Sequence, residues 1–99
     1  MPEKVRKSSG NVFRDLGIPP AEAENLRVRT DLMMQVEKLI EVRGWTQSEA
    51  AKHLGVSKRR ISDLLHGKIE RFSADSLIEM FGRAGYTVTV GARRRSRVA

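Results

Sequence analysis

The sequence contains no cysteine among its 99 residues. Disulfide bonds, thiolate nucleophiles and cysteine-ligated zinc are therefore excluded, which fits a reducing compartment. No apolar run approaches the ~18 residues that a membrane-spanning helix needs, and residues 1–10 lack the apolar centre of a signal peptide. We therefore expect a cytoplasmic protein with no membrane attachment.

Patterns that indicate catalysis or metal binding are also missing. The two histidines, His53 and His66, are thirteen residues apart, and no further ligands stand near them at metal-binding spacing. We find no nucleophile with an adjacent base and no glycine-rich phosphate loop. We expect no metal, no cofactor and no enzymatic activity.

Negative charge is scarce relative to positive charge. Lysine and arginine number 19 against 12 aspartates and glutamates, which gives a net charge of +7 and a pI near 10.6. This surplus favours a polyanionic partner, and nucleic acid is the first candidate. Four of these charges are Arg93, Arg94, Arg95 and Arg97, so the remainder is only mildly basic. The tail is either a nucleic-acid arm or a solvated end.

The length allows one compact domain with a modest core. We expect a partly disordered N-terminal arm over residues 1–18, a folded domain over 19–85, a strand over 86–90 and a basic disordered tail over 91–99. Val12, Phe13 and Leu16 make part of the arm apolar, so it docks either on its own domain or on a partner.

The first long element of the domain is predicted to be an amphipathic helix. Pro19 and Pro20 prevent a helix from continuing through them, and Pro20 suits the first turn of a new helix. Apolar residues from Leu32 to Ile40 recur every three or four positions, and Gly44 ends the pattern. The charged stretch before Leu32 is either a solvated extension of this helix or a separate short helix.

The pattern over residues 46–67 predicts two short helices joined by a tight turn. Thr46 followed by a glutamate three residues later forms a capping box, and Ser57 offers a second N-cap. Helices that cross steeply need a small residue, a left-handed turn residue and an apolar anchor. Ala51, Gly55 and Ile61 supply these in order, so we predict a helix-turn-helix.

The second helix of this unit is predicted to face DNA. Its N-terminal residues meet base edges in this geometry, and Lys58 and Arg59 can donate to guanine, so we assign them to base reading. Arg59 could instead pair with Asp63, four residues on. Residues at the helix ends and on the same face are assigned to phosphate, namely Gln47, Ser57, Arg60, Ser62, Lys68 and Arg71.

A further helix beginning after Ser73 and a strand over residues 86–90 complete the prediction. The strand alternates in polarity but has no partner in the chain. We therefore predict that Tyr86, Val88 and Val90 pair with the same strand of a second subunit. The resulting homodimer would place two recognition helices ~34 Å apart on a palindromic site.

The segment WTQSEAAKHLGVSKRRISDLLHGK resembles the Cro/phage-repressor (XRE) type of helix-turn-helix. Together with NVFRDLG, RFSADSL and YTVTV, it makes residues 11–90 similar to small XRE antitoxins of the HigA-like kind. The resemblance implies that Gln47 contacts a phosphate and that Lys58, Arg59 and Ser62 face DNA. Lys58 departs from the glutamine that often occurs there, so a glutamine–adenine contact is not carried over.

The resulting fold prediction is an all-α, lambda-repressor-like bundle of about five helices with a C-terminal dimerisation strand. The predicted function is a sequence-specific repressor that binds double-stranded DNA as a homodimer and is the antitoxin of a toxin–antitoxin pair. Two alternatives stay open. One is a toxin-neutralising protein in which DNA binding is secondary, and the other is a stand-alone regulator without a toxin.

Overall fold

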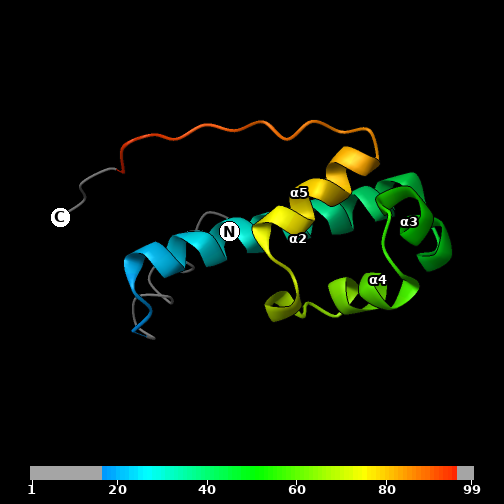
Figure 1. The fold of residues 1–99 in the computed structure, drawn as a ribbon, viewed down its shortest axis with the longest axis horizontal. Coiled ribbons are helices and arrows are strands. Elements are labelled where there is room, and N and C mark those ends of the chain that lie inside the picture. Colours follow the sequence, from blue (N-terminus) through cyan, green and yellow to red (C-terminus); the bar gives the residue numbers. More distant parts are fainter. Residues whose placement is uncertain (1–16, 96–99) are drawn as a thin grey trace, which may run out of the picture.

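The structure, a computed structural model, describes residues 17–95. Predictions for residues 1–16 and 96–99 lie outside this range, including the docking of Val12, Phe13 and Leu16. Within it the all-α prediction is confirmed (Figure 1). The elements are α2 Pro20–Arg43, α3 Gln47–Leu54, α4 Lys58–Leu65, the 3-10 helix η1 Ile69–Arg71, and α5 Ala74–Arg83.

Helix α2 is one continuous helix of 24 residues, against which α4, η1 and α5 pack. Pro20 occupies its first position, where an N–H would have no partner within the helix. Gly44 ends the helix in the left-handed conformation, with φ 69°. The charged first half is therefore an extension of α2 and not a separate helix. Residues 17–95 contain four α-helices and one 3-10 helix. The prediction of about five helices for the bundle is not supported by this described part of the chain.

The hydrophobic core lies between α2 and the three shorter α-helices. The predicted apolar stripe of α2 is buried from Leu32 to Ile40. Each large apolar side chain buried in this way stabilises the fold by roughly 1.5–3 kcal/mol. Packing onto α2 therefore positions α4 and α5, and α3 packs in turn against these two helices. The three shorter helices contribute Ala50, Leu54, Ile61, Leu64, Leu77, Met80 and Phe81, and Phe72 joins them from the segment before α5.

Arg29 attaches the segment after α4 to α2. Its Nη1 donates to the backbone carbonyls of Ile69 and Phe72, each at 3.3 Å, and its Nε donates to Asn25 Oδ1 at 2.8 Å. The carbonyls belong to η1 and its C-terminal flank, so one guanidinium holds this turn against α2.

The predicted strand over residues 86–90 is not formed, since no strand occurs between residues 17 and 95. The Tyr86 N–H donates to Phe81 O at 2.9 Å, and no later residue up to 95 forms a backbone hydrogen bond to another described residue. Residues 86–95 follow an extended path back past α5 (Figure 1). A strand needs a neighbouring strand for its hydrogen bonds, and the described part of a single chain offers none.

The extended C-terminal segment runs toward the N-terminal half of α2. There the hydrogen bond from Arg27 holds the pKa of the Glu24 carboxyl below its usual value, and the charge of Arg95 acts in the same direction. Val88 packs against the core, whereas Val90 is 84% exposed. The segment therefore has one side on the domain and another side exposed.

Candidate nucleic-acid interface

Helix α3, the first helix of the motif, begins with the predicted capping box. Thr46 Oγ1 accepts a hydrogen bond from the Glu49 N–H at 3.1 Å, and Glu49 Oε1 accepts one from the Thr46 N–H at 2.9 Å. Gln47 is the first residue of the helix and is exposed. The N-terminus of a helix attracts anions, so Gln47 lies where a phosphate contact would need it.

The turn between α3 and α4 depends on Gly55. Its φ is 71°, and the Val56 N–H donates to Ala51 O at 3.0 Å. The Arg83 side chain of α5 crosses directly over this glycine, and a Cβ at position 55 would collide with it. Ser57 then caps α4 by accepting a hydrogen bond from the Arg60 N–H at 3.1 Å. The turn and both caps therefore follow the sequence prediction.

Helix α4 has a buried side and a solvent-facing side. Ile61 and Leu64 are buried in the core. At about 100° per residue, four other side chains fall within one arc of about 100°. Three of these are exposed and one is half-buried. They are Lys58, Arg59, Ser62 and His66, and we call the surface that they form the outer arc of α4. The predicted base-reading pair thus lies at the N-terminus of α4, on the face opposite the core.

Two short helices, a left-handed glycine turn and a basic outer face on the second helix together form a helix-turn-helix. A comparison with protein families matches residues 12–93 to the helix-turn-helix domain. The chain belongs to the helix-turn-helix domain family. No curated protein matched the chain. A helix-turn-helix domain suggests a DNA-binding regulator.

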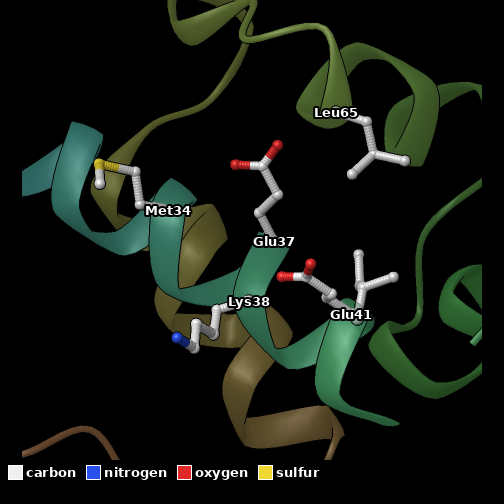
Figure 2. Close-up of a pocket in the computed structure, with 6 residues that line it drawn as sticks. Met34, Glu37, Lys38, Glu41 and Leu65 are labelled. Carbon is white, nitrogen blue, oxygen red and sulfur yellow. The ribbon is translucent and has the colours of Figure 1, made fainter. Parts of the chain in front are cut away.

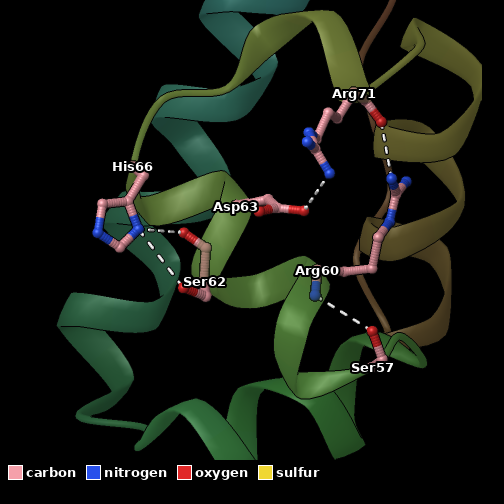
Figure 3. A network of polar contacts seen from close by, with 6 residues as sticks. All are labelled: Ser57, Arg60, Ser62, Asp63, His66 and Arg71. Carbon is pink, nitrogen blue, oxygen red and sulfur yellow. Dashed lines mark hydrogen bonds and ion pairs between the residues drawn. The ribbon is translucent and has the colours of Figure 1, made fainter.

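Arg60, which was predicted to contact phosphate, is held by the helix-turn-helix domain itself. Its Nη1 donates to the backbone carbonyl of Arg71 at 2.7 Å (Figure 3). Its guanidinium carbon lies 4.3 Å from the centre of the buried Phe72 ring. These contacts join α4 to the end of η1 and to the residue that follows it. They give Arg60 a positioning role that the sequence analysis did not identify, while the predicted phosphate contact stays a prediction.

Asp63 is buried, with 8% of its surface exposed, and pairs with Arg71. Arg71 Nη1 lies 3.5 Å from Asp63 Oδ2, and the arginine side chain remains about half exposed. The alternative pairing of Asp63 with Arg59 is not found, and Arg59 makes no ion pair with any residue from 17 to 95. Arg59 and the exposed Lys68 are therefore available to an anionic ligand.

A groove that contains two glutamates lies beside the C-terminal end of α4. It lies between α2 and the end of α4, and Glu37 and Glu41 point into it (Figure 2). These carboxylates would repel DNA phosphates, so this groove itself is unsuited to DNA. The full lining consists of Met34, Glu37, Lys38, Ile40, Glu41 and Leu65.

The described residues contain no cluster of three or more side chains that could hold a metal ion. None of the helices between residues 17 and 95 has the length and apolar character needed to cross a membrane.

Proposed function

We propose that this helix-turn-helix protein is a sequence-specific transcriptional repressor. The observation that supports this most directly is the placement of Lys58 and Arg59, which are exposed on α4 while its opposite side is buried. The first residues of such a helix meet base edges in the major groove, where lysine and arginine donate to guanine O6 and N7. The resemblance to Cro/phage-repressor proteins supports the same assignment.

Phosphate contacts would fix the orientation of α4 in the groove. Gln47 at the start of α3 and Lys68 after α4 are exposed on either side of the base-reading residues. Ser57 and Arg71 already bond within the domain, through the α4 cap and Asp63. We therefore assign the main backbone contacts to Gln47, Lys68 and the half-buried Ser62.

Fluorescence anisotropy tests this function. Labelled DNA from upstream of the protein's own gene is titrated with the wild type and with Arg59→Ala, at two salt concentrations and with excess competitor DNA. Arg27→Ala is the matched control, because Arg27 lies on the first half of α2 and pairs with Glu24 at 2.7 Å.

A bidentate arginine–guanine contact discriminates against the wrong base by about 1–3 kcal/mol, so Arg59→Ala should lower specific affinity roughly 5- to 150-fold. Arg27→Ala should bind like the wild type. If competitor abolishes the binding of all three proteins equally, binding is only electrostatic, and the repressor assignment fails.

We further propose that residues 86–90 pair with the same segment of a second copy. Two observations support this: Val90 is exposed, and residues 87–95 form no backbone hydrogen bonds with any residue between 17 and 95. Two antiparallel segments would supply each other's backbone partners. The dimer would then carry two α4 helices for a palindromic operator.

Sedimentation equilibrium tests the dimer. Thr87→Pro/Thr89→Pro removes backbone donors at two exposed positions and should shift the protein from dimer to monomer. Thr87→Val/Thr89→Val keeps the donors and should remain dimeric. A proline variant that is still fully dimeric would place the interface elsewhere.

We propose, finally, that the regulator is the antitoxin of a toxin–antitoxin pair. The similarity of residues 11–90 to HigA-like antitoxins supports this, and the family match from residue 12 to residue 93 extends well beyond the two motif helices. Val12, Phe13 and Leu16 would form the toxin-binding element, and DNA binding would serve autoregulation.

Co-expression with the product of the neighbouring gene tests the antitoxin proposal. The full chain should restore growth and co-purify with that product, and a chain lacking residues 1–18 should do neither while still binding DNA. Capture that survives the deletion would reject this binding element. A neighbouring product that is neither toxic nor bound would leave a stand-alone regulator, whereas neutralisation without specific DNA binding would make the protein primarily an interaction protein.

A further inference from the structure

His66, the residue that follows α4, is fixed in one orientation by the helix backbone. Its Nδ1 lies 2.7 Å from the Ser62 carbonyl oxygen and 3.4 Å from Ser62 Oγ (Figure 3). A carbonyl oxygen only accepts hydrogen bonds, so Nδ1 carries a proton and donates it to this oxygen. The other ring nitrogen, Nε2, is the one left for a ligand.

The position of His66 fits a contact with the DNA backbone. It shares the outer arc of α4 with Lys58 and Arg59, and it lies eight residues after Lys58. At 1.5 Å per residue this separation is about 12 Å along the helix, so His66 lies well beyond the first turn, whose residues meet base edges. On the same face but past that turn, His66 is placed to meet the phosphates that border the groove.

The charged groups around His66 leave its ring without an ionic partner in the described part of the chain. On α4, Asp63 is turned toward Arg71, and Arg59 is cationic. After α4, Lys68 is cationic as well. On α2, Glu37 and Glu41 line the groove beside Leu65. Neither carboxylate is paired with His66.

The chemistry of phosphate restricts how His66 can bind it. Phosphate ester oxygens on DNA only accept hydrogen bonds. A neutral imidazole whose Nδ1 proton is already donated to Ser62 O presents only an acceptor at Nε2, and two acceptors cannot bond. Contact therefore requires a proton on both nitrogens.

We propose that His66 is a proton-dependent phosphate contact of α4, which binds the DNA backbone only as the imidazolium. The end of a helix favours a cation, and DNA adds a strong negative potential. DNA binding would then take up a proton at His66. This inference rests on the proposed DNA-binding function and adds to it a dependence of affinity on pH.

The test uses a mixed-sequence DNA duplex, because a phosphate contact does not depend on base sequence. Anisotropy titrations over a series of salt concentrations compare wild type, His66→Gln and His53→Gln at about pH 6 and about pH 8, between which an ordinary imidazole changes charge. His53→Gln is the matched control, because His53 is the other histidine of the chain; it lies on α3 and stacks on Trp45, in the turn before that helix.

The wild type and His53→Gln should bind about fivefold more tightly at the lower pH, and the slope of log affinity against log salt should be steeper there by about 0.9, the value for one phosphate contact. His66→Gln should show neither change. Equal pH dependence in wild type and His66→Gln, or its loss only in His53→Gln, would overturn the inference while DNA binding stands. No binding by any protein at either pH would instead refute the proposed function itself.

Discussion

Replacing Arg60 with alanine should weaken the fold, whereas the same change at the neighbouring Arg59 should not. Arg60→Ala removes the hydrogen bond to Arg71 O at 2.7 Å and the guanidinium that covers Phe72 at 4.3 Å. Such a partly exposed hydrogen bond contributes about 0.5–1.5 kcal/mol, and the cation–π contact contributes about 0.5–1 kcal/mol. The expected loss in free energy of unfolding is about 1–2.5 kcal/mol.

Urea unfolding followed by circular dichroism measures this loss. For a domain of this size, 1 kcal/mol also corresponds to a melting temperature lower by about 4–8 °C. Arg59→Ala is the matched control, because Arg59 is exposed and makes no ion pair or side-chain hydrogen bond between residues 17 and 95. Its change should stay within about 0.5 kcal/mol. Equal stability of the two variants would refute the positioning role of Arg60.

Three further substitutions test the architecture of the motif by the same unfolding measurement. Gly55→Ala should destabilise the fold by at least about 1 kcal/mol, because the φ of 71° is unfavourable for alanine and the new Cβ meets the Arg83 side chain. The double variant Gly55→Ala/Arg83→Ala should remove only the collision. Full recovery of stability in the double variant would contradict the argument from backbone conformation. Thr46→Ala should cost about 1 kcal/mol through loss of the capping box, so wild-type stability would disprove the value of that cap. Ile61→Ala should cost about 2–5 kcal/mol, and a loss below 1 kcal/mol would mean that α4 is not anchored there.

The motif helices were predictable because their boundaries depend on residues close together in the chain. The capping box joins Thr46 to Glu49, and Ser57 caps a backbone N–H three residues later. Gly55 ends α3 through its own backbone conformation. Such local signals act within one helical turn, and the predicted motif over residues 46–67 therefore contains α3 and α4 with both of their caps.

Contacts between distant residues were not predictable in the same way. Arg29 bonds to carbonyls 40 and 43 residues further along the chain. In the sequence it is one charged residue among several in the first half of α2, and nothing separates it from solvated neighbours such as Arg27. Its role depends on where the turn after α4 comes to lie, which is decided by packing of the whole domain.

The C-terminal segment shows a different limit of sequence reasoning. The alternation from Thr87 to Val90 is typical of a strand, and the chain there does follow an extended path (Figure 1). Alternation reports which side chains can be buried on one face, but a strand also needs a hydrogen-bonding neighbour. The pattern could therefore predict the conformation of these residues without identifying a partner for them.

Arg59 and Arg60 show why the fold is needed to assign function within the motif. They are adjacent and chemically identical, and one helical step of about 100° separates their directions. That rotation leaves Arg59 on the outer arc and turns Arg60 toward Phe72 and the Arg71 carbonyl. A helix can present a base-reading side chain accurately only when the helix itself is held in position. The core holds the buried side of α4, and Arg60 holds a second side through Arg71 O and Phe72. Loss of Arg60 should therefore reduce DNA affinity indirectly, through the position of α4, and its effect should appear in stability as well as in binding.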